Sequence, residues 1–115
     1  MIIYEYYIDT NKNIYCNPLE VKERPSSFIA KRWQTYSFRS VFYLYEEGLV
    51  LESKADTGND IDKWIFLIER DDEKARQIFI DYYNNIINEL NTKIKTHKQT
   101  IKTISNIKIE DKPKS

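Results

Sequence analysis

The residue types that usually carry out chemistry are scarce in this sequence of 115 residues. His97 is the only histidine and Cys16 the only cysteine. A single histidine excludes most metal sites and most Ser–His or Cys–His arrangements within one chain. Cys16 has no cation or base beside it in the sequence, so we interpret it as a small strand residue rather than a nucleophile. The sequence therefore predicts no catalytic residue, no metal and no cofactor, and an enzyme would need a site shared between subunits.

A short acidic loop has a superficial similarity to a calcium-binding loop. Its carboxylates are Asp56, Asp60 and Asp62. Gly58 comes too early and no glutamate follows at the twelfth position, so the EF-hand order is not met. We interpret the loop as a solvated turn. The sequence also contains no glycine-rich phosphate loop, no paired-cysteine motif and no Gly-x-Ser-x-Gly elbow.

The stretch from Arg24 to Arg39 combines cations with aromatic rings. Residues of both kinds alternate along it: Phe28, Lys31, Arg32, Trp33, Tyr36, Phe38 and Arg39. Single-stranded nucleic acids are bound by rings that stack on bases and by cations that meet phosphates. The candidate face for a nucleic acid or an acidic partner is Lys31, Arg32, Trp33, Tyr36 and Arg39. The alternative is that the aromatic side chains fill the core while the basic stems flank it.

The last third of the chain, from Asp71 to about Ile109, is predicted to be one long helix. Apolar residues recur at alternating steps of three and four, which is the a/d spacing of a coiled coil. These positions are Ile80, Tyr83, Ile87, Leu90, Ile94, His97, Ile101 and Ile104. Asp71 is the predicted N-cap, and Asp72 and Glu73 place negative charge in the first turn. The apolar face is broad in the first half, as covering a sheet requires, and narrow in the second half, as in a contact between two helices.

The narrow half of this helix carries the predicted partner contacts. They are Ile87, Leu90, Ile94, His97, Ile101 and Ile104. In a parallel homodimer, Lys93 and Lys98 would oppose like charges, whereas an antiparallel pair or docking into an acidic groove avoids the clash.

The segments before the helix read as strands and turns. We expect a hairpin of 2–8 and 14–16, a short edge strand around Val21 between Pro18 and Pro25, and a buried strand over 63–69. A second hairpin of 41–45 and 49–51, with Gly48 at a positive φ, is predicted to form the centre of the sheet. The fold class is α+β, with a small antiparallel sheet of about four or five strands followed by the long helix.

Three regions follow from these elements. Residues 1–92 are predicted to form the sheet domain covered by the first half of the helix, 93–109 a protruding helical arm and 110–115 a flexible tail. The chain has 18 basic and 18 acidic residues, so no net charge favours nucleic acid. One cysteine, no signal sequence after Met1 and no run long enough to span a membrane predict a cytoplasmic protein.

Two segments carry a resemblance to a class of proteins. The first is the opening hairpin with its Asp-Thr-Asn-Lys turn, and the second is the segment 67–75 that leads into an Ile- and Lys-rich helix. Together they resemble small accessory proteins encoded by bacteriophages and mobile elements of low-GC bacteria. The resemblance implies a protein of the bacterial host cytosol that binds a host or phage protein, such as an inhibitor of a defence system.

The function predicted from the sequence is that of a non-enzymatic interaction protein. It would assemble as a dimer through the C-terminal helix, or dock that helix on a protein partner. The alternative is a nucleic-acid-binding module that uses the face between Arg24 and Arg39, with the helix as its dimerisation element.

Overall fold

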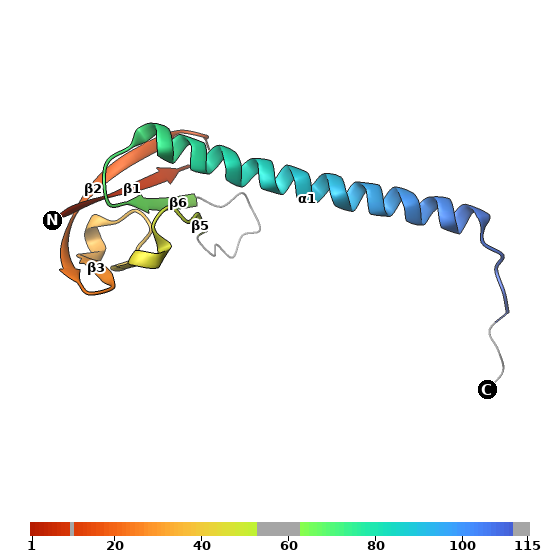
Figure 1. Ribbon diagram of the computed structural model, residues 1–115, viewed down its shortest axis with the longest axis horizontal. Coiled ribbons are helices and arrows are strands. Elements are labelled where there is room, and N and C mark those ends of the chain that lie inside the picture. The colour runs from red at the N-terminus through yellow and green to blue at the C-terminus, as the bar shows by residue number, and fades with distance from the viewer. Residues whose placement is uncertain (10, 53–62, 112–115) are drawn as a thin grey trace. The chain divides into compact units, whose positions relative to one another are not determined.

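A computed structural model describes residues 1–9, 11–52 and 63–111 of the chain (Figure 1). The elements are β1 (Ile2–Ile8), β2 (Ile14–Arg24), β3 (Ser27–Ala30), η1 (Arg32–Gln34), β4 (Val41–Tyr43), η2 (Leu44–Glu46), β5 (Leu51–Glu52), β6 (Lys63–Leu67) and α1 (Asp72–Asn106). Two compact units, Met1–Tyr82 and Tyr83–Ser115, are described separately below. The acidic loop with Asp56, Asp60 and Asp62 and the end of the predicted tail lie outside the described residues.

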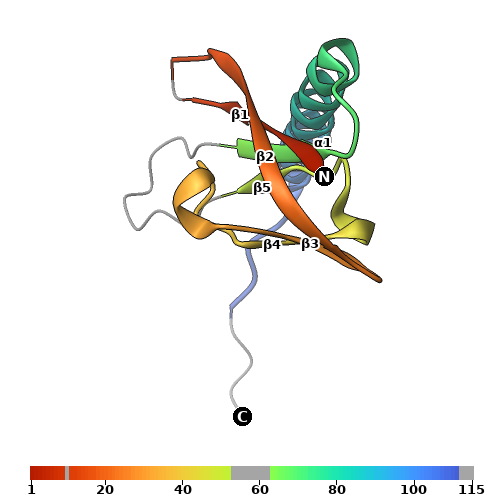
Figure 2. The ribbon, with the colours of Figure 1, turned by 90° about the vertical axis from the view of Figure 1, so that its left-hand side faces the viewer.

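The first unit is built on one curled antiparallel sheet (Figure 2). Its strand order is β4-β3-β2-β1-β6-β5. The predicted α+β class is therefore confirmed, but the sheet has six strands rather than four or five. Ser27–Ala30 forms a strand although the stretch after Phe28 lacks a regular apolar alternation, because it pairs with β2 on one side and β4 on the other.

The predicted first hairpin is confirmed and is longer than expected. β1 pairs with β2 from Ile2 opposite Glu20 to Ile8 opposite Ile14. The turn is closed by Asp9, whose carbonyl accepts the Lys12 N–H at 3.0 Å and whose carboxylate accepts the Asn13 N–H at 2.9 Å. Lys12 takes a positive φ of 69°, the left-handed conformation that such turns need.

Strand β2 corrects the prediction of a short edge strand around Val21. It runs through Pro18 and lies between β1 and β3 in the sheet. β1 pairs with its first part, up to Glu20, and β3 pairs only from Val21 onward. Pro18 therefore lies where β2 has a partner strand on one side only, so its missing N–H breaks no ladder.

The second predicted hairpin does not form. β4 pairs with β3, whereas β5 pairs with β6, so the two segments lie at opposite edges of the sheet rather than at its centre. Between the two segments, residues 44–46 form the turn η2, in which the Glu46 carboxylate accepts the Tyr43 N–H at 3.3 Å. Gly48 has the predicted positive φ, at 75°, and its N–H bonds to the Phe66 carbonyl of β6 at 3.0 Å.

The core of the sheet follows from the alternation of its strands and from its curl. The buried cluster on the inner face is Ile3, Leu19, Val21, Phe28, Ala30, Phe42 and Phe66. Phe66 of β6 meets Phe28 and Phe42 edge to face, with ring centroids 6.4 and 5.4 Å apart. Because Phe28 and Phe42 belong to the far strands of the sheet order, these contacts hold the curl closed.

The opposite face of β6 is buried as well. Ile65 and Leu67 point away from Phe66, and both are about 1% exposed. The first turns of α1, which lie beside β6 in Figures 1 and 2, bury Ala75 and Phe79. The Asp71 carboxylate accepts the Lys74 N–H at 3.0 Å, which confirms the predicted N-cap.

Helix α1 ends at Asn106, three residues before the predicted end at Ile109. From residue 84 to its end, only Ile86 is partly buried and every other residue is exposed. Across the described ranges, no helix combines the length and apolar content needed to cross a membrane.

Candidate interaction surfaces

The second unit exposes the apolar side chains that the sequence singled out on α1. We call Ile87, Leu90, Ile94, His97, Ile101 and Ile104 the helical stripe. The exposed fractions are 52% for Ile87, 51% for Leu90, 49% for Ile94, and 63% for both Ile101 and Ile104, and His97 is exposed too. Isolated exposed apolar residues are common, but a continuous row at helical spacing is not. The helix is therefore amphipathic, and its apolar side is uncovered among the described residues.

The other side of this helix is polar and makes its hydrogen bonds within the helix. Thr92, Thr96 and Thr100 each donate their hydroxyl to the carbonyl four residues earlier, at 3.0–3.1 Å. All formal charges between Glu89 and Glu110 are lysines, at positions 93, 95, 98, 102 and 108. The polar side therefore needs no partner, whereas the helical stripe would gain from one.

A second exposed surface lies in the segment between β3 and β4. We call residues 31–38 the aromatic loop. Trp33 is 78% exposed, Phe38 73% and Tyr36 50%, and the Lys31 ammonium lies 5.9 Å from the centre of the Trp33 ring. The interpretation that these rings fill the core is thus wrong for all three, although it holds for Phe28, which is 4% exposed.

The structure places four of the five residues of the predicted basic face in this loop. They are Lys31, Arg32, Trp33 and Tyr36. Arg39 instead forms an ion pair with Glu46, with 2.7 Å between Nη2 and Oε1. Because Glu46 is nearly buried, this pair fixes η2 against the end of the loop, and Arg39 is occupied by a structural contact.

The backbone of the aromatic loop is held in an unusual conformation. Phe38 has a positive φ of 57°, which a bulky side chain rarely adopts and which costs roughly 1–3 kcal/mol. Arg32 supports it by donating its Nε–H to the Phe38 carbonyl at 3.2 Å. The surrounding contacts therefore impose the loop conformation, and the exposure of Phe38 follows from it.

A buried carboxylate, which sequence analysis missed, anchors the loop to the sheet. Glu5 of β1 is fully buried. Its Oε1 accepts the Tyr36 N–H at 2.8 Å, and its Oε2 accepts the Ser37 N–H at 3.2 Å and the Ser37 hydroxyl at 2.6 Å. Asn17 donates to Oε1 at 3.2 Å and to the Gln34 carbonyl at 2.8 Å. The signal in the sequence was a single acid in the run Ile2–Ile8, on the same face as buried Ile3.

Stacked rings extend this anchor along the inner face of the sheet. Tyr7 stacks on Tyr15, Tyr36 and Trp64, with centroids 5.9, 5.2 and 5.8 Å apart. Tyr7 faces Tyr15 and Trp64 across the two strand pairs of β1, so the pairing register sets two of these contacts. Tyr36 comes from the aromatic loop. One side of that loop is thereby tied to the sheet, while Trp33 and Phe38 remain in solvent.

A third group of polar residues joins β1 to the start of α1. The Tyr6 hydroxyl donates to the Asp72 carboxylate at 2.7 Å and accepts the Asp71 N–H at 3.0 Å, while Arg70 donates to Asp72 at 3.3 Å. Burial, with the bond to Asp72, raises the pKa of the Tyr6 phenol above its usual value. The bonds from Tyr6 and then Arg70 lower the pKa of Asp72, and the bond to Asp72 raises the pKa of Arg70.

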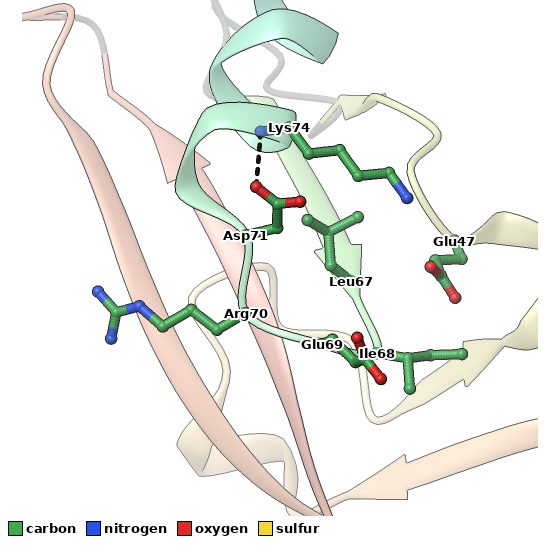
Figure 3. Close-up of a pocket in the computed structure, with 7 residues that line it drawn as sticks. All are labelled: Glu47, Leu67, Ile68, Glu69, Arg70, Asp71 and Lys74. Atoms are coloured by element: carbon green, nitrogen blue, oxygen red, sulfur yellow. Dashed lines mark hydrogen bonds between the residues drawn. The ribbon is translucent and has the colours of Figure 1, made fainter.

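A hollow of about 320 Å³ lies next to this junction (Figure 3). Its lining residues are Glu47, Leu67, Ile68, Glu69, Arg70, Asp71 and Lys74. The Asp71 carboxylate in it is the helix cap, bonded to the Lys74 N–H, and the Arg70 side chain points away (Figure 3). The polar groups of the hollow thus belong to the entry into α1, and the geometry assigns them a structural role.

The chain has one thiol, at Cys16. Cys16 lies on β2 opposite Tyr6, half-buried, as a strand residue. Within the described ranges, no cluster of three or more His, Cys, Asp or Glu side chains could hold a metal ion.

Comparison of the chain with protein families, with curated proteins and with solved structures finds no match.

Proposed function

We propose that this chain is a non-enzymatic interaction protein that assembles through the helical stripe. The observation that carries the proposal is the exposure of five Ile and Leu side chains in one row on α1, each about half or more in solvent. The first occupant to consider is a second copy of the chain, which gives a dimer. The alternative is that the helical stripe docks into an apolar groove of another protein.

The size of the helical stripe sets the strength expected for such a dimer. Full burial of an Ile or Leu side chain contributes about 1.5–3 kcal/mol, so each half-exposed member gains roughly 1 kcal/mol. Ten side chains in two copies give roughly 10 kcal/mol, against an association cost of about 4–15 kcal/mol. At most about 6 kcal/mol remains, so we expect a dissociation constant of about tens of micromolar or weaker, and a dimer that depends on concentration.

The test is sedimentation velocity on the full chain from about micromolar to millimolar concentration. The unaltered chain is expected to pass from monomer to dimer over this range. Replacing Ile94 and Ile101 by Glu is expected to weaken the dimer at least about 100-fold, because unpaired carboxylates would be buried in an apolar contact. Tryptophan fluorescence should stay unchanged in the variant, since Trp33 and Trp64 both belong to the first unit.

The matched control carries the same charge change on the polar side of the helix. Thr92→Glu with Gln99→Glu adds two acids at exposed positions outside the helical stripe. This control should dimerise within a factor of about three of the unaltered chain. A strictly monomeric unaltered chain at millimolar concentration, or an Ile94→Glu/Ile101→Glu variant that still dimerises normally, contradicts the proposal.

The proposal also covers a partner protein other than a second copy of the chain. The resemblance to accessory proteins of bacteriophages and mobile elements makes a host protein, such as a component of a defence system, the first class to test. The helical stripe would then be its contact surface. The Ile94→Glu/Ile101→Glu variant should lose such a partner together with the dimer.

A second candidate function is binding of single-stranded nucleic acid by the aromatic loop. The observation that favours it is the exposure of Trp33 and Phe38 beside Lys31 and Arg32. Stacking of one base on one aromatic ring is worth about 1–3 kcal/mol. Trp33→Ala with Phe38→Ala is therefore expected to weaken binding to a labelled oligothymidine at least about tenfold in fluorescence anisotropy at low salt.

The control for this experiment is an aromatic residue that is equally exposed outside the loop. Tyr45 of η2 is 75% exposed and stacks only on Tyr43 among the described rings. Tyr45→Ala should leave oligonucleotide binding unchanged. No binding by the unaltered chain at low salt, or equal loss in the Tyr45 variant, contradicts the nucleic-acid function.

A further inference from the structure

The residues beside the helical stripe decide in which direction two copies of α1 can pair. We propose that they pair antiparallel, with the twofold axis between Lys95 and Thr96. This inference rests on the proposed dimer and adds its direction and register. All contact residues used below lie in the second unit, Tyr83–Ser115, in helix α1 or directly after it.

Parallel pairing in register is disfavoured by the charges of the helix. With Ile94 at an a position and His97 at a d position, Lys93 occupies a g position and Lys98 an e position. In a parallel pair, a residue at g meets the e position five residues later in the second copy. Lys93 would then face Lys98 of the second copy, and symmetry repeats the contact. His97 would also face His97 of the second copy. No acid between Glu89 and Glu110 relieves this repulsion.

Antiparallel pairing about the proposed axis matches each member of the helical stripe with another member. In antiparallel coiled coils a layer combines an a position with a d position of the second copy. The layers are Ile87 with Ile104, Leu90 with Ile101 and Ile94 with His97, each repeated by the twofold axis. His97 thus faces an aliphatic side chain instead of another histidine. All six members are used, and none is left in solvent.

The flanking positions also agree with this register. In antiparallel pairs, a g position faces a g position and an e position faces an e position. Lys93 and Thr100 occupy g positions, and Asn91 and Lys98 occupy e positions. Lys93 then faces Thr100, and Lys98 faces Asn91, so no lysine meets another lysine. Ile86 faces Ile107, which is 61% exposed directly after the end of the helix. The flanks therefore add apolar contact at both ends and no like-charge contact.

The neighbouring antiparallel registers fit less well. Moving the axis one half-heptad toward the N-terminus, to Thr92, places Lys93 opposite its own copy and brings Tyr83 into the contact. Moving it as far toward the C-terminus leaves Ile87 and Leu90 opposite residues beyond the end of α1 at Asn106. Only the axis between Lys95 and Thr96 uses the whole stripe without opposing two lysines.

Disulfide trapping on the full chain tests the direction and the register together. In a Cys16→Ser background, Ile87→Cys and Ile104→Cys chains are oxidised separately and as a mixture. We expect a crosslinked dimer in the mixture, at least about tenfold more than in either chain alone. Gln99→Cys, on the polar side of the helix, measures the background of random collisions.

The outcomes separate this inference from the proposed dimer. Crosslinking of Ile87→Cys with itself means parallel pairing, and crosslinking with His97→Cys instead of Ile104→Cys means the shifted register; either overturns the inference while the dimer stands. A dimer in sedimentation that gives no crosslink in the mixture also overturns it. A chain that does not dimerise overturns both.

A charge substitution gives a second readout that needs no crosslink. In the parallel arrangement, Lys93→Glu would replace a repulsion by an attraction to Lys98 and tighten the dimer about tenfold. In the antiparallel arrangement Lys93 faces uncharged Thr100, so Lys93→Glu should change the dissociation constant less than about threefold. Tightening of the larger size overturns the antiparallel pairing.

Discussion

Replacing Glu5 by alanine is expected to lower the free energy of unfolding by about 2–4 kcal/mol. A hydrogen bond to a charged group contributes about 1.5–3 kcal/mol, and the Glu5 carboxylate accepts several such bonds. The Tyr36 and Ser37 amides would lose their acceptor, and the Asn17 side chain would lose one of its two acceptors. Part of this loss is offset, since the variant no longer buries a charge. The measurement is urea unfolding followed by tryptophan fluorescence.

Hydrogen exchange locates the effect of the same substitution. The amides of Tyr36 and Ser37 should exchange faster in the Glu5→Ala variant than expected from its lower global stability, since the aromatic loop is released first. Glu20→Ala is the matched control, because Glu20 is exposed on β2, and it should change stability by less than about 0.5 kcal/mol. A Glu5→Ala variant as stable as this control would show that the buried carboxylate is not an anchor.

Replacing Tyr6 by phenylalanine is expected to lower the free energy of unfolding by about 1–3 kcal/mol. The substitution removes the donor to Asp72 and the acceptor of the Asp71 N–H, and leaves the ring in place. Tyr4→Phe is the control on the same face of β1, where the hydroxyl has no hydrogen-bond partner among the described residues. A loss equal in both variants would contradict a specific role of the Tyr6 phenol.

The effect of Tyr6→Phe should depend on pH in a definite direction. The bond from Tyr6 is the main cause of the lowered pKa of Asp72, so the native state favours the ionised carboxylate. The stability gained from it is complete above the ordinary carboxyl pKa of about 4 and is lost as pH falls through the lowered native value. The difference between the unaltered chain and Tyr6→Phe should therefore be largest near neutral pH and shrink in acid. A difference that grows in acid would contradict this assignment.

Features with a local cause could be predicted from the sequence. The period of Ile and Leu residues and the cap at Asp71 gave α1 to within a few residues, and the turn residues after Ile8 gave the first hairpin. The edge strands were predicted as a hairpin because 41–45 and 49–51 are apolar neighbours in sequence. Their true partners, β3 and β6, are determined by how the sheet curls, which a local pattern does not contain.

Features with long-range partners could not be predicted in the same way. Glu5 binds the backbone of Tyr36 and Ser37, 31 and 32 residues away, and Tyr6 binds Asp72, 66 residues away. A lone acid in an apolar strand signals that some partner is needed, but not which one. Whether Trp33 and Phe38 form an exposed face or fill the core stayed open for a related reason, since aromatic residues without a period give no indication of which side faces water.

The edges of the sheet matter for a chain that exposes apolar side chains. Among the described residues, the edge strands β4 and β5 have only three and two residues; β4 passes directly into η2, and irregular backbone precedes β5. A long, flat edge would offer unpaired N–H and carbonyl groups on which further chains could add as strands, the route to fibrous aggregates. The described parts of β4 and β5 offer little template for that growth. The part of β2 before Val21, which β3 does not pair, contains Pro18, which has no N–H to offer to a further strand. Contacts between chains would then depend on side chains, which can be matched and limited in number, rather than on backbone groups that every chain shares.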